Sequence, residues 1–309
     1  MTTEVLYLLF SRMGTLFDTL CFWQSGGMRP LSRVPGLSML LMLLAGCAVE
    51  RIFYYPNRVL YANPDKIGLT YNLVSYPSAN GRMLSALYFP GAAPAKGTIV
   101  HFHGNFANMS NHFPASYFLV QRGFNVLVFD YQGYGASEGK PSRQNTVEDG
   151  QASVQWALSQ STRPVGIFGQ SLGAAVATVV ASKEPAVKAV VLESCFTTYR
   201  AAAAHAMKQN VFTGPCAWVF PPLFVRRALD PWDWVDKIAP RPVFFIHGTA
   251  DRIVPGAMSE KLFARAQEPK RLWLIPDANH MECRRKAGNA YETTVAAFFE
   301  KAFKEKRLN

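Results

Sequence analysis

The sequence has few cysteines, little charge and no long apolar run, and each shortage excludes a class of protein. Five cysteines in 309 residues, with no Cys-x-x-Cys pair, exclude a disulfide-rich scaffold and a cysteine zinc site. No apolar run reaches the roughly 18 to 20 residues of a membrane-spanning helix. Because 49% of the residues are hydrophobic and 17% are charged, we expect a globular chain with a large core.

The positive charge is scattered along the chain. There are 32 Lys and Arg residues against 21 Asp and Glu, a net charge of +11. Two small basic clusters, at residues 284–286 and 301–307, are typical of solvated helix faces. Nucleic-acid binding would require a basic stripe with interleaved aromatic residues or a known module, and the sequence contains neither. No nucleic-acid partner is therefore expected.

The amino-terminal region predicts an export signal. A short apolar segment, residues 36–44, follows the basic residues Arg29 and Arg33, as in a signal peptide. Residues 44–47, with the sequence LAGC, resemble the lipobox of bacterial lipoproteins, in which the cysteine is acylated and becomes the first mature residue. The alternative is a buried helix that ends at Gly46.

The lipobox resemblance implies a cellular location. It places the signal proper at residues 28–46 and an upstream extension at residues 1–27, with translation starting at Met1 or at Met28. A lipid on Cys47 would anchor the protein to the bacterial envelope. Ala48 after the cysteine favours the outer membrane, facing the periplasm.

Eight apolar runs predict the strands of a sheet. Most of the runs are continuous, which is typical of strands buried on both faces. An Asn-Gly pair at residues 80–81 predicts a hairpin between the first two. The predicted strands are residues 71–76, 83–89, 98–103, 124–130, 165–168, 187–192, 242–246 and 271–275.

Helix-like segments alternate with these strands, which predicts crossover connections and an α/β fold with a mostly parallel sheet. The long gap at residues 196–239 contains many aromatic residues, and we expect it to form a cap over the carboxyl ends of the strands. Length alone suggests two domains, but residues 47–309 are expected to form one. The predicted helices are residues 114–122, 146–158, 172–182, 257–266 and 287–304.

Residues 169–173, with the sequence GQSLG, fit the G-x-S-x-G pattern of a nucleophile elbow. The setting carries more weight than the letters, because a buried strand ends there and a helix rich in Ala and Val begins. A sharp turn would project Ser171 above the sheet, and the two glycines would let helix and strand approach closely. The helix amino terminus would offer the Leu172 N–H to a developing oxyanion.

A serine at neutral pH needs a base that is oriented by an acid, and two later residues are candidates. Asp251 and His280 each follow a predicted strand, in the chain order Ser, Asp, His. Taken singly, Asp251 could be a turn residue paired with Arg252, and His280 an exposed loop residue. Their shared position beyond strand ends favours catalysis. Glu193, at the end of the sixth strand, is the alternative acid.

Together these motifs resemble the serine-aminopeptidase-like group of the α/β-hydrolases, over about residues 71–303. The similarity rests on HFHGN after the third strand, DYQGYGAS after the fourth, GQSLG after the fifth, HGTADRIVP after the seventh and ANH after the eighth. It implies an α/β-hydrolase fold, with an eight-stranded, mostly parallel sheet and helices on both faces. It also implies Ser171 as nucleophile, Asp251 as acid and His280 as base, with the Asn105 N–H as a second oxyanion donor.

The resemblance implies a serine hydrolase that acts by acyl transfer on a carboxylic ester or thioester. The aromatic cap and the expected membrane location favour an apolar acyl group. Two alternatives stay open. One is a peptidase, with Glu138 and Asp130 as candidates for binding a free amino group. The other is an inactive envelope adaptor on the same fold.

No cofactor or metal is expected. His101 and His103 form an H-x-H pair, but residues 104–112 lack the Asp and the adjacent His that usually complete a hydrolase metal cluster. An oxidising compartment would permit a disulfide between Cys195 and Cys216, which the sequence alone does not decide. The oligomeric state also stays open.

Overall fold

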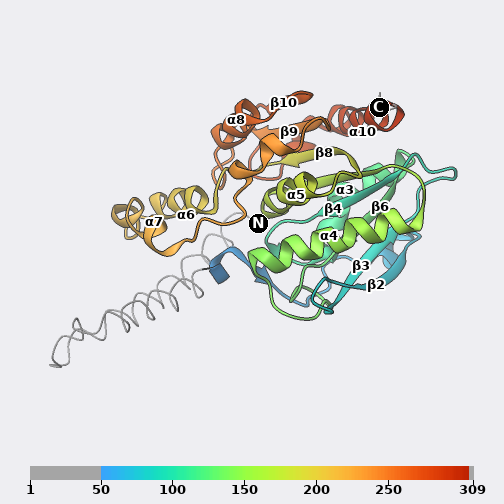
Figure 1. Cartoon of the computed structure of the whole chain (residues 1–309), viewed down its shortest axis with the longest axis horizontal. Coiled ribbons are helices and arrows are strands. Elements are labelled where there is room, and N and C mark those ends of the chain that lie inside the picture. Colours follow the sequence, from blue (N-terminus) through green and yellow to red (C-terminus); the bar gives the residue numbers. More distant parts are fainter. Residues whose placement is uncertain (1–49, 306–309) are drawn as a thin grey trace.

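Each of the eight predicted runs forms a strand, and the strands make one sheet in the computed structural model, which describes residues 50–305 (Figure 1). The strand order is β10-β9-β8-β7-β4-β6-β3-β2. Pairing is parallel from β10 to β6 and antiparallel at the β6–β3 and β3–β2 edges. The strands are β2 (Asn72–Pro77), β3 (Met83–Phe89), β4 (Thr98–Phe102), β6 (Asn125–Phe129), β7 (Val165–Gln170), β8 (Val187–Glu193), β9 (Val243–Gly248) and β10 (Lys270–Ile275).

The predicted hairpin is confirmed between β2 and β3. Ser78 N–H donates to the Arg82 carbonyl at 2.8 Å, and Gly81 has a φ of +79°, which favours glycine. The central strands β4, β6, β7 and β9 are buried along their whole length, as their continuous apolar runs predict. The edge strand β2 is largely exposed.

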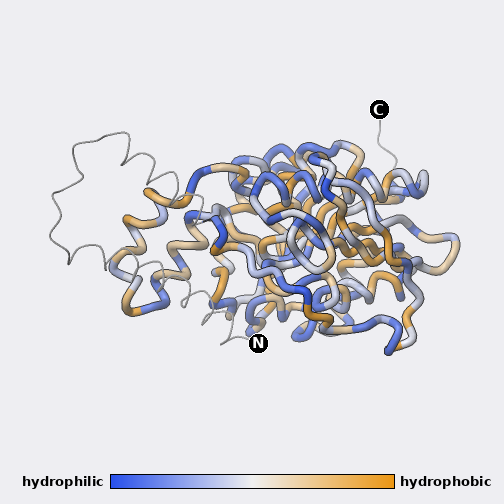
Figure 2. The backbone as a smooth tube through the Cα atoms, turned by 90° about the horizontal axis from the view of Figure 1, so that it is seen from below, coloured by the Kyte–Doolittle hydropathy of each residue, from blue (hydrophilic) through white to orange (hydrophobic). Residues whose placement is uncertain are grey.

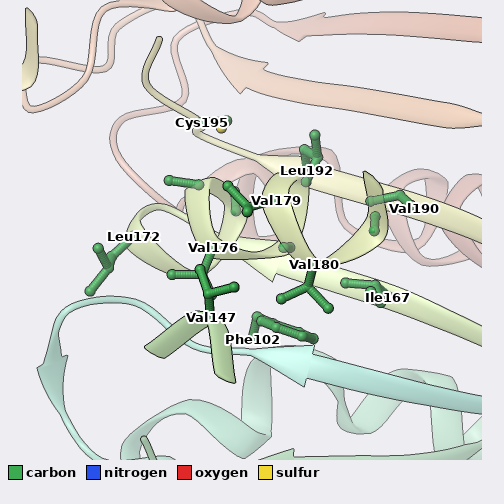
Figure 3. Close-up of a cluster of buried hydrophobic side chains, with 14 of the residues drawn as sticks. Phe102, Val147, Ile167, Leu172, Val176, Val179, Val180, Val190, Leu192 and Cys195 are labelled. Carbon is green, nitrogen blue, oxygen red and sulfur yellow. The ribbon is translucent and has the colours of Figure 1, made fainter. Parts of the chain in front are cut away.

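Helices cover both faces of the sheet. On one face lie α4 (Arg143–Gln160), α5 (Leu172–Lys183) and α8 (Gly256–Arg265); on the other lie α3 (Met109–Gln121), α9 (Cys283–Ala287) and α10 (Asn289–Lys304). Successive residues of a strand point to opposite faces, so Val190 of β8 packs toward α5 while Val191 packs toward α10. Figure 3 shows Val176 and Val180 of α5 packed in the hydrophobic core on the α5 face of the sheet.

Several helix boundaries differ from the prediction by a few residues, and two of these differences have a local cause. Helix α3 begins at Met109, where the Asn108 side chain accepts a hydrogen bond from Ser110 N–H. Pro114 therefore lies inside the helix, although a proline in a helix interior is unfavourable because it removes a backbone hydrogen bond. The last predicted helix is interrupted at Gly288, which has a φ of +54° and separates α9 from α10. A two-stranded parallel sheet, β1 (Tyr55–Pro56) with β5 (Phe106–Ala107), was not expected.

The segment between β8 and β9 contains short helices only: α6 (Tyr199–Lys208), α7 (Phe220–Phe224) and the 3-10 turns η4 (Gly214–Cys216), η5 (Pro231–Asp233) and η6 (Val235–Lys237). Helices α6 and α7 project from the body at one end of the long axis (Figure 1). Hydrophobic segments occur both in the sheet and in this projection (Figure 2).

Several expectations concern residues before Glu50. Cys47 and the predicted signal lie outside the described residues. Across residues 50–305, none of the helices combines the length and the apolar character needed to cross a membrane. Cys195 and Cys216, for which the sequence left a disulfide open, are both free thiols in this part of the chain.

Candidate active site

Ser171 occupies a strained turn between β7 and α5. Its φ of 54° and ψ of −118° are unusual for a residue other than glycine, and they place it outside both the strand and the helix. A side chain at Gly173 would overlap the carbonyl oxygen of Phe102, and a Cβ at Gly169 would come within 2.8 Å of the Ala174 Cα. Both glycines are therefore needed to bring the helix and the strand this close together.

The structure brings the three predicted residues together in one chain of hydrogen bonds. His280 Nε2 lies 2.9 Å from Ser171 Oγ, and His280 Nδ1 lies 2.7 Å from Asp251 Oδ2. Asp251 lies on the loop after β9, and His280 lies on the loop after β10. This arrangement is the one in which a histidine takes a proton from a serine while a carboxylate holds the ring in place.

The surroundings of Asp251 keep it ionised. Its Oδ1 accepts hydrogen bonds from the backbone N–H groups of Ile253 and Val254, both at 2.9 Å. Burial alone would raise the pKa of Asp251, but the electrostatic interaction with His280 and the hydrogen bonds from His247, His280 and Val254 outweigh burial and hold the pKa below its usual value. A turn residue paired with Arg252 is therefore the wrong description of Asp251.

His247 supports the acid, a role that the sequence analysis missed. Its Nε2 lies 2.8 Å from the Val254 carbonyl oxygen and 3.1 Å from Asp251 Oδ2. Because both partners accept hydrogen bonds, the network assigns a proton to Nε2, and Nδ1 lies 2.6 Å from Ser259 Oγ. The available signal was a histidine at a strand end, four residues before the acid.

Glu193, the alternative acid, is occupied elsewhere. Its side chain is fully buried, and Oε2 accepts hydrogen bonds from Gln170 Nε2 at 2.7 Å and from Tyr291 Oη at 2.9 Å. In the described part of the chain His280 is paired with Asp251 and not with Glu193, so the geometry favours Asp251 as the acid. The Ser171 N–H donates to the Glu193 carbonyl at 2.9 Å, which ties the serine turn to β8.

Leu172 and Asn105, the two predicted oxyanion donors, line the same cavity as Ser171 and His280. Leu172 is the first residue of α5, so its N–H has no acceptor within the helix. His103 Nδ1 lies 2.7 Å from the Gly104 carbonyl oxygen, which can only accept. In a trans peptide the C=O and N–H point in opposite directions, so this bond directs the Asn105 N–H away from His103.

A largely apolar cavity of about 440 Å³ lies over the serine. Its walls come from the body and from the segment between β8 and β9, and a few polar side chains complete the lining. The apolar lining includes Phe53, Phe106, Phe196, Met207, Phe220 and Met281, and the polar lining includes Asn111, Glu282 and Arg285. No group of three or more metal-ligating side chains within residues 50–305 is arranged to hold a metal ion.

Comparison with known proteins agrees with this architecture. A family described as serine aminopeptidase S33 matches residues 93–240. The uncharacterised protein YfhR of Escherichia coli K12 is 32% identical over 265 residues, which cover 81% of this chain and 88% of that protein. The chain belongs to the α/β-hydrolases.

A plant protein and a solved archaeal structure are also similar to this α/β-hydrolase. The α/β-hydrolase domain-containing protein WAV2 of Arabidopsis thaliana is 29% identical over 288 residues, covering 86% of this chain and 94% of WAV2. The solved structure of an esterase from Pyrococcus furiosus superposes with a TM-score of 0.69 at 23% identity, covering 81% of this chain and 98% of the esterase. The second likeness shows the shared fold.

Proposed function

We propose that this α/β-hydrolase is a serine hydrolase that cleaves a carboxylic ester or thioester through an acyl-enzyme. One observation carries the proposal. Ser171, His280 and Asp251 form a continuous hydrogen-bond chain at the base of an apolar cavity, with contacts of 2.9 and 2.7 Å. The esterase fold of the Pyrococcus furiosus structure is in keeping with this reaction.

In the proposed mechanism, His280 Nε2 takes the Ser171 proton as Oγ attacks the substrate carbonyl. The oxyanion that forms accepts hydrogen bonds from the Leu172 and Asn105 N–H groups. His280 then gives its proton to the departing alkoxide or thiolate, which leaves as an alcohol or thiol. A water molecule, deprotonated by His280, attacks the acyl-enzyme, and the acid is released as Ser171 recovers its proton. Asp251 stays ionised throughout.

The cavity lining favours an ester over a peptide substrate. An aminopeptidase would need a carboxylate to bind the free amino group of its substrate. Asp130 is buried and accepts a hydrogen bond from Met109 N–H at 2.6 Å, and Glu138 accepts one from Met83 N–H at 3.1 Å. Neither residue is among those that line the cavity. Among the described lining residues the one carboxylate is Glu282, which pairs with Arg285 at 2.8 Å.

The inactive-adaptor alternative is tested by labelling with a fluorophosphonate, which reacts only with an activated serine. We expect the wild type to be labelled, Ser171→Ala to be silent, and the matched control Ser159→Ala, which changes an exposed serine on α4, to be labelled like the wild type. A folded wild type that takes no label would overturn the proposed function. If the wild type is labelled, a screen of acyl esters graded by chain length would define the preferred acyl group.

The proposed location is the bacterial envelope, with a lipid on Cys47 holding the enzyme at the outer membrane on its periplasmic side. Acyl chains on one cysteine contribute about 0.8 kcal/mol per buried CH₂, so several chains suffice for stable attachment. The proposed partners are an acyl ester or thioester substrate and the membrane.

A further inference from the structure

Part of the segment between β8 and β9 turns large apolar side chains to solvent. Trp218 is 76% exposed, Phe212 87% and Leu223 69%. Together with Val211 and Val219 they form what we call the cap patch, five exposed apolar residues within 13 positions. A concentration of this kind on one short segment is unusual for a surface that faces only water.

The same segment lines the cavity with its other side. Met207 and Phe220 lie in the cavity wall, while Lys208 and Leu223, one and three residues further on, are exposed. The wall between the cavity and solvent is therefore about one layer of side chains thick here. Whatever contacts the cap patch therefore lies close to the cavity that contains Ser171.

The stretch of chain that carries the cap patch has basic residues and no acidic ones. Residues 194–229 contain no Asp or Glu, and they contain Arg200, Lys208, Arg226 and Arg227. Lys208 and Arg226 are exposed, and Arg227 pairs with Asp233, just beyond this stretch, at 3.2 Å. Exposed Trp and Phe beside basic side chains suit the boundary between acyl chains and anionic headgroups.

We propose that the cap patch docks on an anionic lipid surface, so that an apolar acyl ester passes from the bilayer into the cavity. The substrate class rests on the proposed function, but the docking does not. Docking also does not require the lipid on Cys47, since the apolar and basic groups both lie within residues 200–227. The proposed docking deepens the function by naming a membrane-dissolved substrate.

Trp218 provides a test of docking that is independent of activity. The full chain is mixed with vesicles that contain brominated phosphatidylglycerol, whose bromine quenches tryptophan only within the bilayer. We expect quenching in the wild type, a loss of part of that quenching in Trp218→Phe, and no loss in the control Trp273→Phe on β10. The quenching should be weaker with brominated phosphatidylcholine, because that lipid has no net charge.

Other occupants give different results, and each would overturn the proposal. If a second copy covers the patch, Trp218 is protected from the aqueous quencher acrylamide as protein concentration rises, without lipid. If residues 1–49 cover it, that protection is independent of concentration. In both cases Trp218→Phe leaves quenching by the brominated lipid unchanged.

Hydrolysis separates docking from chemistry. In the double variant Phe212→Ser/Leu223→Ser, two large side chains can no longer be buried in the bilayer. We therefore expect turnover of a long-chain ester in phosphatidylglycerol vesicles to fall about tenfold or more. Turnover of a soluble short-chain ester should be unchanged. The control Leu73→Ser removes a leucine of similar exposure, 68%, on β2 and should change neither. Equal vesicle turnover in the double variant would overturn docking, whereas a wild type inactive on both esters would defeat the proposed function alone.

Discussion

The candidate active site and the cap, the segment between β8 and β9, differ in how firmly their side chains are held. At the site, Asp251 accepts two backbone N–H bonds, His280 bridges two partners, and Gly173 fills a space that admits no Cβ. In the cap, the longest helix has 10 residues, and large apolar groups face solvent. The site is built to hold one geometry. The outer face of the cap is the surface that we propose docks on a membrane.

This difference separates the proposed chemistry from the choice of substrate. Changes at the site should alter turnover of every substrate, because they act on the reacting atoms. Changes on the outer surface of the cap should alter only the turnover of substrates that arrive through a membrane. The predictions that follow test the site first, where effects should be largest, and end with attachment, where the effect on chemistry should be smallest.

The largest effect is expected at the nucleophile and the base. Ser171→Ala and His280→Ala should each lower kcat on a soluble ester by about 10⁵-fold or more, because members of a triad act as a unit. The double variant should be no worse than either single variant. Circular dichroism should show an intact fold. Losses that multiply in the double variant would mean that the two residues act independently.

The next largest effect distinguishes the two candidate acids. In Asp251→Asn an amide N–H₂ would face His280 Nδ1 and favour the wrong tautomer, so kcat should fall by about 10³- to 10⁴-fold. Glu193→Gln keeps an acceptor oxygen for Gln170 and Tyr291, and kcat should fall by less than about tenfold. If Glu193→Gln proved the more damaging while both proteins stayed folded, Asp251 would not be the acid.

Much of the site could be predicted from sequence because its signals are local. The GQSLG turn requires a strand before it and a helix after it, and both are visible in the residue pattern. The parallel order of strands then places Asp251 and His280 at the same edge. The role of His247 was missed, because its position at a strand end does not show how the loop folds back to bring it to Asp251 and Ser259.

The missed features of the fold have a different physical origin. Pro114 predicts a helix start, but burial of Phe113 and Phe118 on either side of it and the Asn108 cap outweigh the lost backbone bond. The short pairing of β1 with β5 has too few residues to leave a pattern. The exposure of Phe212 and Trp218 was not predictable either, because an apolar residue in sequence is normally assigned to the core.

A smaller effect is expected on stability at low pH. The pKa of Asp251 is lowered in the folded protein, so its stabilisation is complete above the ordinary aspartate pKa of about 3.9 and is lost as pH falls below it. Between about pH 5 and 3 the free energy of unfolding should fall more steeply in the wild type than in Asp251→Asn, as measured by urea denaturation.

The matched control for this measurement is Asp277→Asn. It removes an exposed carboxyl from the loop that follows β10 and leaves the hydrogen bonds of Asp251 in place. Asp277→Asn should keep the steep loss of stability seen in the wild type. Identical slopes in the wild type and in Asp251→Asn would show that the Asp251 carboxylate does not stabilise the fold.

The smallest effect on chemistry is expected at the lipid anchor, because no proposed catalytic residue precedes Cys47. Expressed in a Gram-negative host, the mature wild type should begin at an acylated Cys47, detected by mass spectrometry and by incorporation of labelled fatty acid. Cys47→Ala should take up no lipid and leave turnover of a soluble ester unchanged, whereas Cys21→Ala should still be acylated. A wild type that keeps its amino terminus and carries no lipid would defeat the anchor. The proposed docking through the cap patch does not depend on this result.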